Sequence, residues 1–155
     1  MDHPLRKGEG WGEVGEFNQL PLQCKCALML QSIHHIAIIC SDYQRSKQFY
    51  TEILGLTIIA EVYRAERDSW KLDLALNGRY VIELFSFPSP PQRVSRPEAA
   101  GLRHLAFSVI DMEEAVRLLS AKGVTLEPVR TDEFTSKKFT FFSDPDGLPL
   151  ELYEA

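Results

Sequence analysis

The chain has 155 residues and a net charge of −5. This length is typical of one domain, which buries roughly 70% of the surface of its unfolded chain. No apolar run approaches the roughly 20 residues that span a bilayer, and the negative charge argues against nucleic acid or an anionic membrane as a partner. Three cysteines without a disulfide framework indicate reduced thiols and a cytoplasmic protein.

Residues 1–30 differ in pattern from the rest of the chain. They hold four glycines among scattered charges and show no sustained helical or strand period. The apolar run at residues 26–30 is too short for the core of a signal peptide. We therefore expect a poorly ordered tail over residues 1–30 and a single domain over residues 31–155.

Residues 32–87 predict a first module with the element order β-α-β-β-β. A strand-like run over residues 32–40 precedes Asp42, which is suited to cap a helix whose apolar positions recur every three or four residues until Gly55. Three strand candidates follow, at residues 57–63, 70–76 and 80–85. The Asn77-Gly78 pair between the last two is typical of a tight hairpin turn.

Residues 88–101 predict a linker, because their prolines prevent a regular helix or a central strand. Residues 102–155 then repeat the first pattern, with Asp111 as the helix cap and Gly123 as the helix end. Strand candidates lie at residues 104–109, 126–130, 137–143 and 150–153. The repetition indicates an internal duplication of one βαβββ module.

Four polar residues recur at equivalent places in the apolar strands of the two modules. His35 and His104 each begin a strand-like run, 69 positions apart, and Glu83 and Glu151 lie in the last strand of each module. Taken singly, each is explained as well by a core histidine or by a solvated sheet face. Two interior carboxylates would repel each other unless a cation joined them, so the set favours a divalent metal site.

These motifs together resemble the vicinal oxygen chelate superfamily, and within it the glyoxalase I-like bacterial proteins of the YaeR type. The motifs are the His-[Ile/Leu]-Ala strands, the Phe49-Tyr50-x-x-x-Leu54-Gly55 helix end, and the Asp144-Pro145-Asp146-Gly147 turn before Glu151. The resemblance covers residues 32–153. It implies an α+β fold, the glyoxalase/bleomycin-resistance/dioxygenase-like fold, in which two βαβββ modules form a half-barrel metal cleft.

The resemblance also implies a metal site and an activity. One divalent ion per site, Zn²⁺, Ni²⁺, Co²⁺ or Mn²⁺ and less readily Fe²⁺, is held by His35, Glu83, His104 and Glu151, often across a homodimer. The implied enzyme is a lyase or isomerase that transfers a proton on a small α-oxygenated substrate, with Glu151 as the first candidate base and Glu83 as the second. The residues we expect in the substrate pocket are Arg103, Phe85, Phe87, Trp70 and Tyr153.

Three positions depart from glyoxalase I. Ile39 stands where that enzyme has an arginine that holds the glutathione carboxylate, Phe87 where it has an asparagine, and Arg103 where glycine or histidine is usual. These departures argue against lactoylglutathione formation as the main activity. The alternatives are an oxygenase or thiol transferase, which typically uses two histidines and one glutamate, and a metal-free binding protein of the bleomycin-resistance type. The full set of four ligands argues against both.

Overall fold

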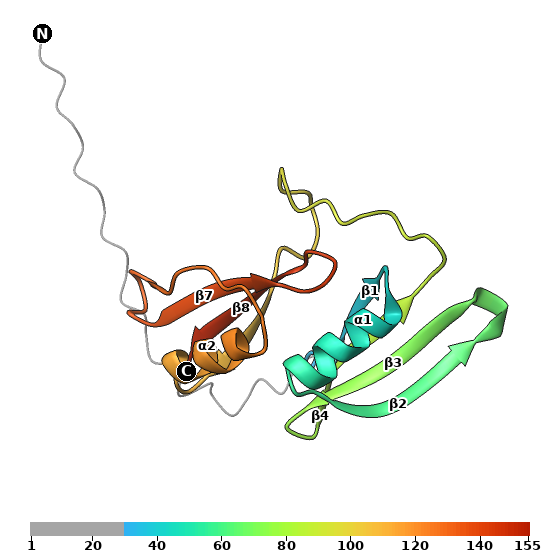
Figure 1. Cartoon of the computed structure of the whole chain (residues 1–155), viewed down its shortest axis with the longest axis horizontal. Coiled ribbons are helices and arrows are strands. Elements are labelled where there is room, and N and C mark those ends of the chain that lie inside the picture. Colours follow the sequence, from blue (N-terminus) through green and yellow to red (C-terminus); the bar gives the residue numbers. More distant parts are fainter. Residues whose placement is uncertain (1–29) are drawn as a thin grey trace, which may run out of the picture. The chain divides into compact units, whose positions relative to one another are not determined.

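Two four-stranded sheets of like topology account for the repeated sequence pattern (Figure 1). The computed structural model describes residues 30–155, and Ile33–Ala155 form one folded unit. The tail expected over residues 1–30 falls almost wholly outside the described residues. The predicted α+β class with two βαβββ modules is confirmed. None of the described helices is long and apolar enough to cross a membrane.

The first sheet has the strand order β1-β4-β3-β2, in which β1 runs parallel to β4 and the other neighbours are antiparallel. Its module consists of β1 (Ile36–Cys40), α1 (Tyr43–Gln48), the π-helical turn η1 (Phe49–Ile53), β2 (Thr57–Arg64), the 3₁₀ turn η2 (Ala65–Arg67), β3 (Ser69–Leu76) and β4 (Arg79–Ser86). All strands predicted for this module are present, with ends that shift by a few residues.

The second sheet repeats the topology in the order β5-β8-β7-β6, again with its first and last strands parallel. Its module consists of β5 (Leu105–Val109), α2 (Met112–Ala121), β6 (Arg130–Thr131), β7 (Lys138–Ser143) and β8 (Pro149–Glu154). The strand predicted at residues 126–130 is largely wrong, since regular pairing begins only at Arg130. Pro128 has no N–H to donate to a ladder, although the Glu127 N–H still donates to the Phe141 carbonyl at 2.8 Å.

The predicted local signals explain where the helices begin and how β3 turns into β4. The Asp42 carboxylate accepts a hydrogen bond from the Arg45 N–H at 3.1 Å and so caps α1, as predicted. Asp111 caps α2 in the same way. Asn77 and Gly78 have φ of 51° and 77°, which is the conformation that a two-residue hairpin turn requires.

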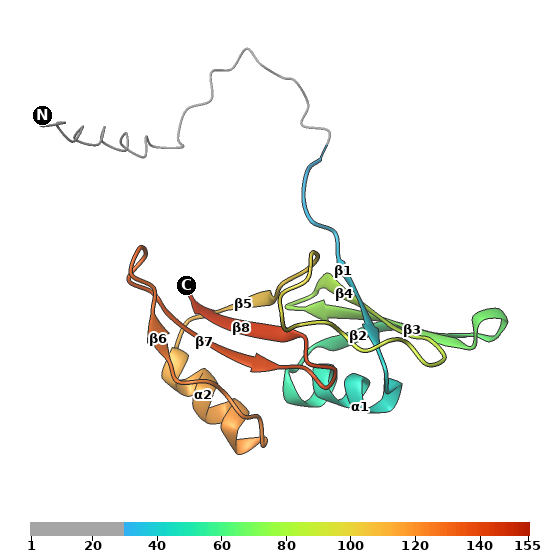
Figure 2. The same ribbon diagram turned by 90° about the horizontal axis from the view of Figure 1, so that it is seen from above.

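The helices cover one face of each sheet and leave the other face uncovered. Figure 2 shows α1 and α2 on the same side of the strands. Alternate residues of the central strands point toward the helices and form the core, including Leu72, Leu74, Ile82, Leu84, Leu150 and Leu152. Because side chains alternate along a strand, the intervening residues of β4 and β8 lie on the uncovered face.

Polar contacts join the two modules, and one of them is buried. The Tyr50 hydroxyl in η1 donates to Asp144 Oδ2, in the turn between β7 and β8, at 2.9 Å. Burial raises the pKa of Asp144, and the hydrogen-bond donors around this carboxyl stabilise its charged form. The Lys122 ammonium donates to the carbonyls of Glu52 and Ile53, at 2.7 and 2.8 Å, and so satisfies the end of the first module's helix.

We expect the Tyr50→Phe variant to lose about 1–3 kcal/mol of unfolding free energy, because it leaves a buried carboxylate oxygen without its donor. Urea denaturation measures the loss. Tyr63→Phe is the matched control, since it removes a tyrosine–aspartate bond to Asp68 that is exposed. Its expected loss is below about 0.5 kcal/mol. Similar losses in both variants would contradict a structural role for the contact between the modules.

Candidate metal centre

The first His–Glu pair lies where β1 begins beside β4. The parallel register aligns Ala37 with Glu83, so His35, two residues earlier, lies on the same face as the glutamate. His35 Nε2 is 3.1 Å from Glu83 Oε2, and the two side chains are 33% and 14% exposed. An imidazole nitrogen and a carboxylate oxygen therefore face each other at the uncovered face of the first sheet.

The second pair has the same construction in the second sheet. The β5–β8 register aligns Ala106 with Glu151, and His104 stands two residues before the alanine. His104 Nε2 is 3.0 Å from Glu151 Oε2, with side-chain exposures of 32% and 12%. The duplication thus reproduces the partners, the atoms in contact and the degree of burial.

The four predicted ligands come together as two pairs and not as one cluster. Within residues 30–155, no three His, Cys, Asp or Glu side chains are grouped so that they could hold a metal ion. The donor types fit a divalent transition ion, because imidazole nitrogen and carboxylate oxygen are ligands of Zn²⁺, Ni²⁺, Co²⁺ and Mn²⁺. One pair supplies two ligands, whereas a catalytic zinc site typically takes three from protein, so a complete centre needs both pairs.

The first pair is surrounded by polar groups. His35 Nδ1 lies 2.8 Å from Nδ1 of His34, and the Tyr80 ring stacks on the His35 ring with centroids 5.0 Å apart. The Tyr80 hydroxyl donates to Asp73 Oδ1 at 3.0 Å. Burial, together with this bond, raises the pKa of Tyr80 to about 12, so its hydroxyl stays a donor at neutral pH.

A lysine completes these surroundings. Lys71 Nζ lies 2.7 Å from Glu83 Oε1 and 2.5 Å from Asp73 Oδ1. Partial burial by itself lowers the pKa of Lys71, but its bonds to the two carboxylates outweigh burial and raise that pKa above the ordinary value. The Lys71 ammonium is therefore charged and contacts both Glu83, a predicted ligand, and Asp73 in β3.

The second pair lies instead among aromatic rings. Phe141 faces Glu151 across β7 and β8, as Asp73 faces Glu83 across β3 and β4. The His104 ring meets the Phe141 ring edge to face, with centroids 5.3 Å apart. Its Nδ1 is buried and has no hydrogen-bond partner within the described part of the chain.

The residues that surround the two pairs are not singled out by the sequence motifs. Lys71, Asp73, Phe139 and Phe141 were not predicted as part of the site. A signal for them is present in the sequence, because the offset of 68 positions that relates Glu83 to Glu151 also relates Lys71 to Phe139 and Asp73 to Phe141.

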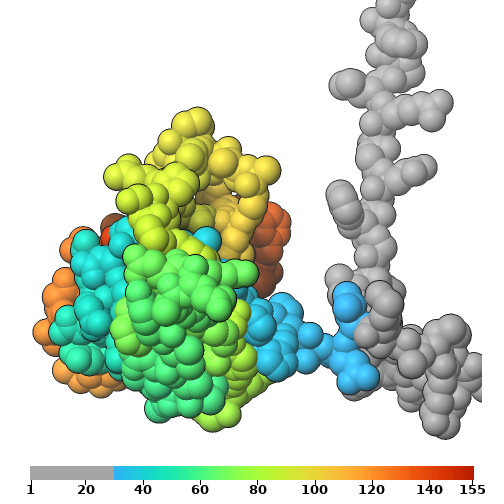
Figure 3. Space-filling view, turned by 90° about the vertical axis from the view of Figure 1, so that its right-hand side faces the viewer, coloured from blue at the N-terminus to red at the C-terminus, as the bar shows by residue number. Residues whose placement is uncertain are grey.

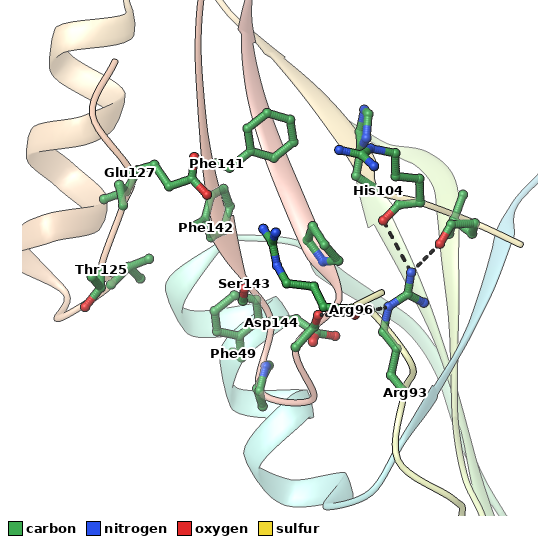
Figure 4. A pocket seen from close by; sticks show the side chains of 18 of the residues that line it. Phe49, Arg93, Arg96, His104, Thr125, Glu127, Phe141, Phe142, Ser143 and Asp144 are labelled. Atoms are coloured by element: carbon green, nitrogen blue, oxygen red, sulfur yellow. Dashed lines mark hydrogen bonds between the residues drawn. The ribbon is translucent and has the colours of Figure 1, made fainter. Parts of the chain in front are cut away.

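A pocket of about 970 Å³ adjoins the second pair (Figure 4). His104 and Phe141 line one wall, and the linker contributes Arg93 and Arg96. Arg103, next to His104 in the chain, is the one predicted pocket residue that lines this pocket. Arg93 Nη2 donates to the carbonyl of Arg103 at 3.3 Å, and this bond connects the linker to the approach to His104. Figure 3 shows the linker, in yellow, standing above the strands of the first sheet.

The other predicted pocket residues lie outside this pocket. Phe85 shares the uncovered face with Glu83, and its ring stacks near that of Phe87 at 6.0 Å. The Arg64 guanidinium lies 4.6 Å from the centre of the Phe85 ring, so this end of the first sheet is both aromatic and cationic.

Tyr153 lies on the uncovered face of its sheet, whereas Trp70 lies on the covered face of the other sheet. Tyr153 lies on the face of Glu151, and its hydroxyl donates to Asp132 Oδ2 at 3.1 Å. Trp70 lies on the covered face of the first sheet, where its ring stacks on that of Tyr43 in α1, with centroids 5.1 Å apart. The sheet therefore separates Trp70 from the first His–Glu pair.

Known proteins resemble this chain in both sequence and fold. The Glyoxalase/Bleomycin resistance protein/Dioxygenase superfamily matches residues 32–152. The uncharacterized proteins YwkD of Bacillus subtilis and YaeR of Escherichia coli K12 are each 66% identical over 127 residues, which are 82% of this chain and 99% and 98% of theirs. A glyoxalase family protein from Enterococcus faecalis is 51% identical, with a TM-score of 0.75 over 80% of this chain and 98% of its own.

Relatives with named activities are more distant. The glutathione transferase FosA of Serratia marcescens is 33% identical over 127 residues, which are 81% of this chain and 82% of FosA. The lactoylglutathione lyase of Salmonella typhimurium is 33% identical over 131 residues, which are 78% of this chain and 90% of the lyase. The resemblance drawn from the motifs is confirmed: the chain belongs to the Glyoxalase/Bleomycin resistance protein/Dioxygenase superfamily.

Proposed function

We propose that this chain is a divalent-metal-dependent enzyme of the glyoxalase I type, a lyase or isomerase that transfers a proton on a small α-oxygenated substrate. The observation that carries the proposal is the repeated His–Glu pair, with nitrogen–oxygen distances of 3.1 and 3.0 Å at equivalent places of two sheets. The lactoylglutathione lyase among the relatives supports this class of reaction.

The centre is completed in a homodimer, where His35 and Glu83 of one copy meet His104 and Glu151 of the other. Separate pairs on separate sheets support this arrangement, because neither pair suffices alone. The face of the first pair also carries exposed apolar side chains, with Ile39 at 56% and Val62 at 54% exposure. Exposed apolar surface beside an incomplete site is typical of a surface that a second copy covers.

The proposed chemistry divides among the ion, Glu151 and the arginines of the pocket. A divalent ion held by the two pairs would supply Lewis acidity to the substrate. Glu151, 12% exposed and beside Phe141, is the base, and it takes the proton at Oε1, the oxygen that His104 does not face. Arg93 and Arg96 of the linker line the same pocket as His104, where they favour an anionic group on the substrate.

The recognition of glutathione is not part of this proposal. Ile39 stands on the face of the first pair with no charge to offer a glutathione carboxylate. Thiol transfer is nevertheless the second candidate, because FosA is as similar in sequence as the lactoylglutathione lyase, each at 33% identity. Product analysis separates the two, since a transferase joins the thiol to the substrate whereas an isomerase leaves the atom count of its substrate unchanged.

We expect protein purified without chelators or a histidine tag to bind one divalent ion per chain, which is one ion for every two His–Glu pairs. Glu83→Gln and Glu151→Gln each remove a charged ligand and should weaken binding by about 10-fold or more. Elemental analysis and chelator competition measure this. Glu61→Gln is the control, because Glu61 contacts Lys47 and Tyr43 and no predicted ligand. Wild-type protein that takes up no Ni²⁺ or Zn²⁺ would refute the metalloenzyme.

Mixing two inactive variants tests the shared centre. A dimer of His35→Ala with His104→Ala contains one site with both changes and one site with neither, if each site takes one pair from each copy. We expect random mixing to restore about one quarter of the wild-type metal sites, since about half of the dimers are mixed. No restoration after verified subunit exchange would place both pairs of a site in one chain.

A further inference from the structure

The two oxygens of Glu83 have different partners. Oε2 faces His35 Nε2 at 3.1 Å, so this is the oxygen that would contact the proposed ion. Oε1 lies 2.7 Å from Lys71 Nζ. An ammonium this close to a carboxylate oxygen makes a charge-assisted hydrogen bond, which fixes that oxygen in direction as well as in distance. Rotation of the Glu83 carboxylate toward a two-oxygen contact with an ion would break this bond.

Lys71 is itself held in place, although a lysine side chain is ordinarily mobile. Its ammonium contacts Asp73 Oδ1 at 2.5 Å, and the Tyr80 hydroxyl donates to the same oxygen at 3.0 Å. The Tyr80 ring in turn stacks on His35, with centroids 5.0 Å apart. The contacts therefore form a closed ring through Lys71, Asp73, Tyr80, His35 and Glu83, and each member limits the motion of the next.

The second module lacks these contacts. Glu151 Oε2 faces His104 at 3.0 Å, while Oε1 has no hydrogen bond or ion pair to any residue within 30–155. Phe139 and Phe141 occupy the β7 positions that correspond to Lys71 and Asp73 in β3. The chain thus presents the same ligand type in two environments, one with a cation at its second oxygen and one without.

We propose that Lys71 is a positioning residue that holds Oε1 of Glu83, so that Glu83 offers the metal one fixed oxygen while Glu151 remains free to leave it. This role rests on the proposed function, because it concerns the ion that the two His–Glu pairs would share. Contacts behind a metal ligand typically change metal affinity by about 10- to 100-fold when they are removed.

Co²⁺ binding to the full chain tests the proposal, with affinity measured by chelator competition and ligand geometry by the visible absorption spectrum. In Lys71→Met the Glu83 carboxylate gains freedom to rotate, so we expect affinity to fall by about 10- to 100-fold and the spectrum to change. Lys71→Arg keeps the cation and should restore most of both. Lys47→Met is the matched control, because Lys47 also pairs with a glutamate at 2.7 Å, at similar exposure and on no predicted ligand.

Wild-type Co²⁺ affinity and an unchanged spectrum in Lys71→Met would overturn the role of Lys71, and so would equal losses in the Met and Arg variants. If Lys71→Met fails to fold, Asp73→Asn weakens the hold on the lysine and should shift affinity and spectrum in the same direction by a smaller factor. Wild-type protein that takes up no Co²⁺ would instead overturn the proposed function, and this role with it.

Discussion

Parallel pairing of β1 with β4 and of β5 with β8 aligns Ala37 with Glu83 and Ala106 with Glu151. In each module the histidine two residues before the alanine is thereby placed on the face of the glutamate. A register shift of one residue would turn the glutamate toward the helices, where the core is apolar. Hydrophobic alternation therefore specifies the face on which each of these histidines and glutamates lies, and the duplication specifies it twice.

The same constraint explains why these carboxylates need partners. Glu83 and Glu151 are 14% and 12% exposed, and a charge that is largely removed from water is costly unless an opposite charge or a hydrogen-bond donor compensates. The histidines provide one partner each. In the first module Lys71 is a second partner of the glutamate, whereas the aromatic neighbours in the second module provide no charge or hydrogen bond. The two modules therefore differ in the residues of β3 and β7 that lie beside the glutamates.

The fold was predictable because short signals agree with each other. The caps at Asp42 and Asp111 and the Asn77-Gly78 turn are local, and each is present in the structure. The repeat then placed His35 and His104 without any tertiary information. The predicted strand at residues 126–130 failed because Pro128 within it cannot donate to a ladder.

What surrounds the ligands was harder to predict, because it depends on which residue of a neighbouring strand lies opposite. The contact of Lys71 with Glu83 follows from the β3–β4 register, which the sequence does not specify to the residue. Trp70 is a different case. Alternation places it with Leu72 and Leu74 on the covered face, so the sequence itself indicates that Trp70 points away from Glu83.

The difference between Lys71 and Asp73 in one module and Phe139 and Phe141 in the other also bears on how a substrate is oriented. A centre built from two halves with identical surroundings would offer a substrate two equivalent orientations. A charged, hydrogen-bonded half opposite an aromatic half removes that equivalence, because the polar end of a bound molecule has only one favourable side. On the proposed function, the divergence of two strand positions after duplication gives a bound molecule one preferred orientation at the ion.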